Sequence, residues 1–167
     1  AGGIDRLYEL ARIMVTLVGL FRKVKVLGVL VDSEAMGVEE RIESLTNGLR
    51  SAGLDVDRPK RLCAHTFEFR WPGQRVRLLV SVSGLSGSHA GVDFDRFNTH
   101  SMDDHVALLM LLEGEPIREA LEAAECAKRV TAPYRPYDRL IREASAQSVS
   151  AAFEHVRCLF ARVSEAA

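Results

Sequence analysis

Apolar residues recur along the first third of the chain, first with the spacing of a helix and then with that of a strand. From Asp5 to Leu20 they fall on one stripe, which predicts an amphipathic helix. The run from Val24 to Val31 is rich in β-branched residues and apolar on both faces in its second half, as in a strand buried between two layers. Residues 38–52 return to helical spacing, and Gly53 is well suited to end that helix.

The middle of the chain alternates between strand-like runs and turn residues. The runs from Leu62 to Phe69 and from Arg75 to Ser83 predict two strands, and the Pro-Gly pair within Trp71 to Gln74 indicates a turn between them. The following segment, Gly84 to Thr99, is rich in glycine and has no clear period. A loop of this length usually has a function or is disordered.

The C-terminal half is expected to be helical. Ser101 is followed by acidic residues within the next three positions, a typical helix start. Helical stretches are predicted for His105 to Leu112, Glu115 to Val130, and Tyr137 to Val163, the last as one long helix or a pair. The order of elements favours an α/β or α+β sandwich, and we predict the α/β class, a sheet flanked by helices, in a single domain of 167 residues. Its core would span about 1–130, and a helical extension about 131–167.

One face of the last predicted helix is apolar and needs a covering surface. We expect this stripe to pack either on the sheet or on a partner subunit. The second alternative would make the protein a homo-oligomer. Its members are Phe153, Val156, Leu159, Phe160 and Val163.

Charge and composition limit the class of partner. Lysine and arginine number 22 against 23 acidic residues, and the net charge of −1 excludes a broad electrostatic attraction to nucleic acid or to an anionic membrane. No apolar run reaches the roughly 18 residues that cross a bilayer, and no signal peptide is recognisable at the start. These features are typical of a cytoplasmic globular domain and predict no membrane partner.

The cysteines suggest no framework when they are considered by themselves. Cys63, Cys126 and Cys158 are odd in number and far apart, and they form neither a Cys-x-x-Cys pair nor a recognisable Cys/His spacing. We therefore expect buried or idle thiols, without a disulfide or a structural zinc site.

Two acidic pairs are the candidates for chemistry. Asp32 and Glu34 directly follow the predicted buried strand, at the kind of strand end where ligands bind in α/β proteins. Asp103 and Asp104 lie at a predicted helix start, and a return of the chain to the sheet edge would bring them beside Asp32. Carboxylates gathered there can bind a hard cation. The alternative is that these acids form no site. Asp32 would then cap a turn and Glu34 would be solvated, while the second pair would be stabilised at its helix start by the helix dipole.

The first third of the chain resembles a known family. Gly2-Gly3-Ile4-Asp5-Arg6-Leu7, followed by a helix and by the run from Lys25 to Glu34, is similar to the central part of Toprim-fold proteins. The likeness is to small prokaryotic Toprim-like proteins related to the nuclease domain of the OLD family, in which a buried strand ends in Asp-x-Asp. Gly53-Leu54 resembles the end of the family's next helix, and Met102-Asp103-Asp104 its later acidic motif. The match covers residues 2 to about 57, and more weakly 100–130.

This resemblance implies a Toprim-like sheet and a metal-dependent activity. Asp32, Glu34, Asp103 and Asp104 would hold Mg²⁺ or Mn²⁺, with the choice between the last two open, and Lys128 would neutralise charge in the transition state. The reaction would be cleavage or transfer of a phosphodiester in DNA or RNA. In the alternative, a Toprim-like module or another α/β interaction domain binds a partner without chemistry.

The chain departs from the family pattern at two points. Glu34 stands where the family has aspartate, which lengthens the ligand arm by one methylene. The family also carries a glutamate at the end of a first strand ahead of the Gly-Gly segment, and this chain begins at that segment. The resemblance therefore implies that this strand and its glutamate either precede Ala1 in a longer protein or are lacking.

A basic and aromatic cluster leaves two interpretations open. It would bind a nucleic-acid backbone with stacked bases, or form a solvated helix face whose tyrosines rest on the core. Its members are Tyr134, Arg135, Tyr137, Arg139 and Arg142.

Overall fold

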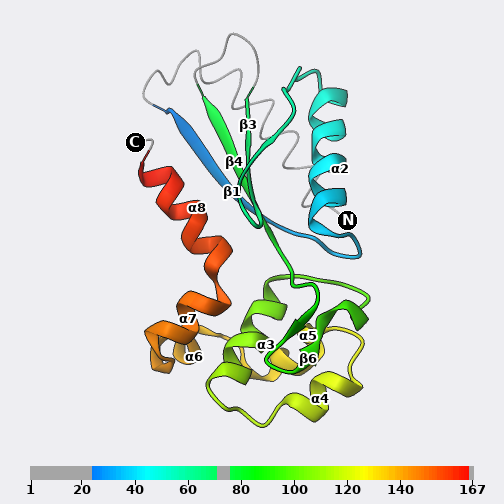
Figure 1. Cartoon of the computed structure of the whole chain (residues 1–167), viewed down its shortest axis with the longest axis vertical. Helices are drawn as coiled ribbons and strands as arrows, with labels where there is room; N and C mark the ends of the chain where they lie inside the picture. The colour runs from blue at the N-terminus through cyan, green and yellow to red at the C-terminus, as the bar shows by residue number, and fades with distance from the viewer. Residues whose placement is uncertain (1–23, 71–75, 166–167) are drawn as a thin grey trace.

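The computed structural model describes residues 24–70 and 76–165 and is a mixed α/β fold (Figure 1). Four strands form the main sheet in the order β1-β4-β3-β2, with β1 and β4 parallel and the other pairs antiparallel. The strands are β1 (Val26–Asp32), β2 (Lys60–Cys63), β3 (Thr66–Phe69) and β4 (Arg77–Ser83). The predicted helix from Asp5 to Leu20 and the predicted turn at Trp71 to Gln74 lie outside the described residues.

Helices cover both faces of this sheet. Helix α2 (Val38–Ser51) packs its apolar stripe on one face, where Leu78, Val80 and Val82 of β4 point. On the other face, helix α8 (Glu154–Ser164) approaches β1 so closely that a Cβ added at Gly28 would lie 3.1 Å from Val163. Part of the predicted apolar stripe thus covers the sheet.

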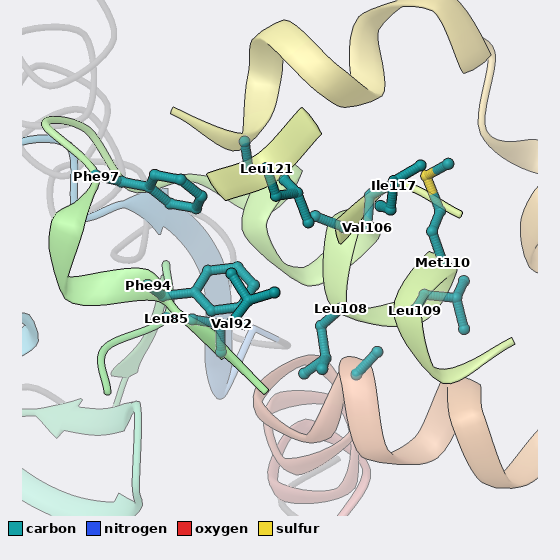
Figure 2. Close-up of a cluster of buried hydrophobic side chains, with 13 residues drawn as sticks. Leu85, Val92, Phe94, Phe97, Val106, Leu108, Leu109, Met110, Ile117 and Leu121 are labelled. Carbon is teal, nitrogen blue, oxygen red and sulfur yellow. The ribbon is translucent and has the colours of Figure 1, made fainter. Parts of the chain in front are cut away.

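A second core lies below the sheet in Figure 1 and is built from the remaining helices. They are α3 (Met102–Leu112), α4 (Arg118–Ala123), α5 (Ala127–Thr131), α6 (Asp138–Glu143) and α7 (Ala146–Ala152), with short 3₁₀ turns at Phe94–Arg96 and Ala132–Tyr134. Figure 2 shows Phe94 and Phe97 beside the side chains of α3 and α4. Both rings are almost wholly buried, so the segment from Gly84 to Thr99 is part of the core.

That segment contains more structure than its sequence suggests. Strands β5 (Ser88–His89) and β6 (Val92–Asp93) form a small hairpin around Ala90 and Gly91, both of which have positive φ. The expected irregular loop is therefore a folded unit that connects the sheet to the second core.

The predicted elements agree with the structure in some segments and differ from it in others. Strand β1 and helix α2 match their predictions, and the side chain of Ser101 caps α3 by accepting a hydrogen bond from the Asp103 amide. The predicted strand from Leu62 to Phe69 is instead the β2–β3 hairpin, turned at Ala64 and His65. The long predicted helices near 115–130 and 137–163 are broken into α4 and α5, and into α6, α7 and α8.

Burial is distributed differently from the prediction. Strands β3 and β4 are almost wholly buried, whereas β1 is only half buried and its Leu30 is 40% exposed. Among the described strands β1 pairs with β4 alone, so neighbouring strands cover it on one side only.

Gly84 joins the sheet to the second core at a crowded point. It has φ +133°, and a Cβ there would lie 2.2 Å from Ser33 Oγ and 2.7 Å from His100 Cβ. Only glycine fits such a conformation with the side chains of Ser33 and His100 so close.

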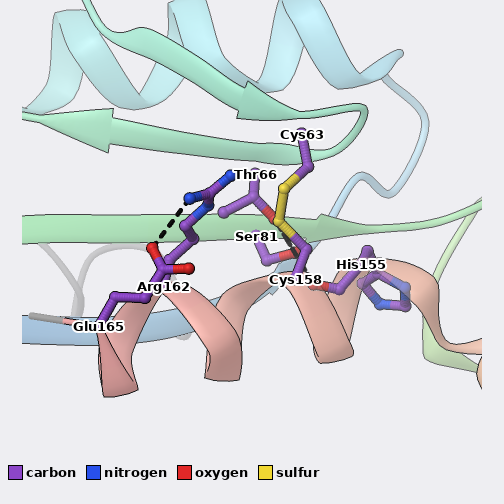
Figure 3. The surroundings of a disulfide bond; sticks show 7 residues. All are labelled: Cys63, Thr66, Ser81, His155, Cys158, Arg162 and Glu165. Carbon is purple, nitrogen blue, oxygen red and sulfur yellow. Dashed lines mark hydrogen bonds and ion pairs between the residues drawn. A yellow bond between two sulfur atoms is a disulfide. The ribbon is translucent and has the colours of Figure 1, made fainter.

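The structure corrects the expectation of idle thiols. Cys63, at the end of β2, forms a disulfide with Cys158 on α8, 95 residues away in the sequence, while Cys126 is free (Figure 3). The bond ties the β2–β3 hairpin of the sheet to α8, the helix that packs on the face opposite α2. Sequence spacing could not show this pair, because only the packing of α8 brings the two residues together.

Candidate functional site

Asp32 is where the sequence places the first metal ligand, at the carboxyl end of β1. Its Oδ1 accepts a hydrogen bond of 3.0 Å from the amide of Met102, the first residue of α3. That amide is one of the donors that a helix leaves unpaired at its N-terminus. The acidic start of α3 therefore does return to the sheet edge beside Asp32, as predicted.

The pKa of Asp32 is raised above its usual range. Partial burial is the main cause, and the negative charges of Asp103 and Glu34 add to it, while the Met102 amide and Arg41 oppose it. The raised pKa of Asp32 therefore reports mainly the partial burial of its carboxyl group, with neighbouring charges of both signs acting in opposite directions.

Glu34 lies in the turn after β1 with φ 57°, and its backbone exchanges hydrogen bonds of 2.8 and 2.6 Å with His100. Its carboxylate is turned toward Arg41 of α2, with Nη2 to Oε2 at 3.0 Å. The guanidinium of Arg41 is buried and also donates to the Ser33 carbonyl. Glu34 is therefore partly neutralised by a fixed counterion.

Asp103 is the more extensively bonded of the two acids on α3. Arg135 Nη2 reaches both carboxylate oxygens at 3.0 Å, Thr131 Oγ1 donates at 2.9 Å, and the Tyr137 hydroxyl donates as well. Burial alone would raise the pKa of Asp103, but these three donors and the charge of Arg135 outweigh it and hold the pKa below its usual range. Asp103 is thus ionised and tied to the 131–137 segment.

Asp104 points into the interior instead. Its Oδ2 accepts hydrogen bonds from the Leu85 amide at 3.1 Å and from His100 Nδ1 at 3.0 Å, while no partner is found for its buried Oδ1 within the described residues. Burial raises the pKa of this carboxyl group. Of the two acids that the sequence left open, Asp103 is the one whose charge reaches Asp32.

Lys128 is exposed on α5, and within residues 24–70 and 76–165 it forms no ion pair with these acids. The cation that contacts Asp103 is Arg135, which the sequence placed in the basic and aromatic cluster. Arg139 and Arg142 of that cluster pair with Glu143 and Asp138 within α6. The cluster is therefore divided, and only Arg135 and Tyr137 belong to the acidic edge.

The four acids fit a divalent ion only in part. Mg²⁺ and Mn²⁺ prefer several oxygen ligands, yet all four carboxylates already have a positive or hydrogen-bonding partner, and for Asp32 this is only the Met102 amide at one oxygen. In the described part of the chain, no group of three or more His, Cys, Asp or Glu side chains is arranged to hold a metal. Asp32 is the open ligand, and Asp103 can join it only if Arg135 moves away.

A second polar cluster, which we call the histidine pocket, lies between the sheet and the second core. A cavity of about 320 Å³ is lined by His65, His89, His105, His155 and Glu154, so four of the five histidines meet there. The rings of His105 and His155 stack with centroids 3.9 Å apart. Burial lowers the pKa of His105 to about 3 and that of His155 to about 4, so both are neutral at pH 7.

Sequence reasoning did not find this pocket, although a signal existed. Cys63-Ala64-His65 and His155-Val156-Arg157-Cys158 each place a cysteine near a histidine. Neither spacing is typical of a structural zinc motif, so the sequence alone does not predict a Cys/His site, and only the packing of α8 on the sheet brings the two segments together.

The described residues include no helix with the length and apolarity needed to span a membrane. Comparisons with protein-family models, with curated proteins and with solved structures gave no match to this chain.

Proposed function

We propose that the chain is a Toprim-like domain that binds Mg²⁺ or Mn²⁺ at the end of β1 and acts on a phosphodiester of DNA or RNA. The observation that carries this proposal is the hydrogen bond from the Met102 amide to Asp32. It joins the strand end to the acidic start of α3, as the resemblance requires.

Asp32 is the residue best placed to hold the ion. Its side chain borders solvent, and its Oδ2 has no partner among the described residues. The bound ion would polarise a phosphoryl oxygen and stabilise the leaving alkoxide. Arg135 takes the role expected of Lys128, because a guanidinium pairs well with the oxygens of a phosphate and this one is half exposed at 48%.

A second candidate function is a Toprim-like module that binds a partner without chemistry. The ion pairs of Glu34 with Arg41 and of Asp103 with Arg135 favour it. In each pair an arginine of the chain supplies the positive charge that a metal ion would otherwise supply. The acids can therefore stay in place without a metal.

Calorimetric titration with Mn²⁺ tests the metal site. We expect the wild-type chain to bind and Asp32→Asn to lose binding, with Asp55→Asn, an exposed aspartate after α2, as the matched control. Equal heats from wild type and Asp32→Asn, or no heat from the wild type, would overturn the metal site. Cleavage of labelled DNA and RNA with Mn²⁺ then separates the two functions, since the binding module leaves both intact.

A further inference from the structure

Two short segments, far apart in the sequence, bring two cysteines and two histidines together. Cys63 and His65 flank Ala64 in the β2–β3 turn, and His155 and Cys158 lie one turn apart on α8. The Cα atoms of the cysteines are 6.7 Å apart, and the ring centroids of His65 and His155 are 6.1 Å apart. Figure 3 shows Cys158 and His155 on the side of α8 that faces the hairpin.

The i, i+3 spacing on α8 matters for this geometry. Residues three apart on a helix share one face, so both side chains can reach a common point beside the hairpin. Cys63 and His65 approach that point from the other side, at the rim of the histidine pocket.

The hydrogen bonds of both histidines leave one nitrogen open. The Nδ1 of His65 lies 3.2 Å from the Val82 carbonyl, which can only accept, so Nδ1 carries the proton and Nε2 keeps its lone pair. The Nε2 of His155 bonds Ser83 Oγ at 3.2 Å, and its buried Nδ1 has no hydrogen-bond partner. Histidines that bind metal through one nitrogen usually fix the other on a carbonyl or a similar group.

His105 differs from these two. Its Nδ1 donates to the Ala152 carbonyl at 2.7 Å, and its Nε2 accepts from the Gly84 amide at 3.0 Å. With both nitrogens occupied, His105 supports the stack but has no lone pair for a ligand.

We propose that Cys63, His65, His155 and Cys158 form a tetrahedral Zn²⁺ site when the two cysteines are reduced. Two thiolates with two imidazoles are a common ligand set of structural zinc. The structure holds the oxidised form, in which the sulfurs are joined to each other and cannot act as thiolates. Only two of the four ligands then remain, in keeping with the absence of a group of three or more metal ligands among the described residues. Glu154, which also lines the pocket, adds a negative charge near the ion.

The change between the two forms is a balanced exchange. A dithiol gives two electrons and two protons to the Cys63–Cys158 bond, which becomes two thiols while the dithiol becomes a disulfide. Zn²⁺ then displaces the two thiol protons. The same four residues would hold α8 on the sheet in either state, by a covalent bond or through a metal.

Titration of the reduced full chain with Co²⁺, a spectroscopic substitute for Zn²⁺, tests the proposal. After anaerobic removal of the dithiol, we expect one equivalent of Co²⁺ to give thiolate-to-metal charge-transfer bands and intense visible bands of a tetrahedral site, all removed by Zn²⁺. Oxidised protein should give none of these bands. Reduced protein that keeps its native circular dichroism but shows no such bands would overturn the site.

Variants assign the ligands. Cys63→Ser and His65→Ala should weaken Co²⁺ binding by more than about 100-fold, and Ser83→Ala, behind His155, by about 10–100-fold. Cys126→Ser is the matched control and should leave the spectrum unchanged. An unchanged spectrum in Cys63→Ser would refute the assignment. Asp32→Asn should keep the Co²⁺ bands, which separates this site from the proposed Mn²⁺ site at β1.

Discussion

The acidic edge at β1 and the histidine pocket are two polar clusters that satisfy their groups in different ways. At the acidic edge, Glu34 and Asp103 face the guanidinium groups of Arg41 and Arg135. In the pocket, burial lowers the pKa values of His65, His105 and His155, and these three imidazoles bond to backbone carbonyls and a hydroxyl group. The edge therefore balances its charges internally, whereas these buried imidazoles stay uncharged at pH 7.

This difference affects what each cluster can bind. A carboxylate that already faces a counterion attracts a metal less strongly, and each of these pairs has one buried member, Arg41 or Asp103, that would be left without its partner if the pair opened. A neutral imidazole with one fixed nitrogen can bind a metal without such a loss. The cluster that the sequence made conspicuous is thus the less available one, apart from Asp32.

Removal of the disulfide should give the largest effect on stability. Under oxidising conditions Cys63→Ser should lower the free energy of unfolding by roughly 2–5 kcal/mol, because the bond closes a loop of 95 residues. Urea unfolding followed by circular dichroism measures it, with Cys126→Ser expected to stay within about 0.5 kcal/mol of wild type. The two variants should converge in a metal-free reducing buffer, and a persistent difference there would show that Cys63 acts through something other than the bond.

Truncation at the acidic edge should cost somewhat less. Asp103→Ala removes the acceptor of Thr131, Tyr137 and Arg135, and should destabilise by about 2–3 kcal/mol. Asp138→Ala, which breaks an exposed pair with Arg142, is the control and should cost less than about 1 kcal/mol. Chemical denaturation of both variants measures the two losses of unfolding free energy. Equal losses would mean that the hydrogen bonds around Asp103 stabilise the fold no more than an exposed ion pair does.

Glu68 of β3 provides a third, smaller comparison. Its carboxylate is 3% exposed and pairs with Arg70 and Arg77 at 3.0 and 3.1 Å. Burial alone would raise its pKa, but the hydrogen bonds and charges of both arginines outweigh it and hold the pKa below the usual 4.5. We expect Glu68→Gln to cost about 1–2 kcal/mol at pH 7.

The pH dependence of that cost has a defined sign. Because the folded pKa is depressed, the stabilisation is fully present above about pH 4.5 and is lost as the pH falls through the folded value. The difference between wild type and Glu68→Gln in urea unfolding should therefore shrink below pH 4.5. A difference that stays constant down to pH 3 would show that the arginines do not stabilise the ionised form.

Prediction from sequence succeeded where local patterns decide the structure. The β-branched run before Asp32 and the apolar stripe of residues 38–52 gave β1 and α2 nearly to the residue. It failed between Leu62 and Phe69, since the tight turn at Ala64 and His65 contains no glycine or proline. It also failed for the helices after Glu115, where the expected long helices are divided and α4 to α7 each end after one or two turns.

Local sequence determined β1, β4 and α2, the cap at Ser101 and the position of the acids at element ends, because each depends on residues nearby in the chain. Tertiary structure alone decided which of these groups meet. Asp32 reaches Met102 across 70 residues, Ser83 reaches His155 across 72, and Cys63 reaches Cys158 across 95. Such contacts form only when α3 and α8 pack against the sheet. The local spacing of apolar and polar residues does not specify which distant residue each of these groups will contact.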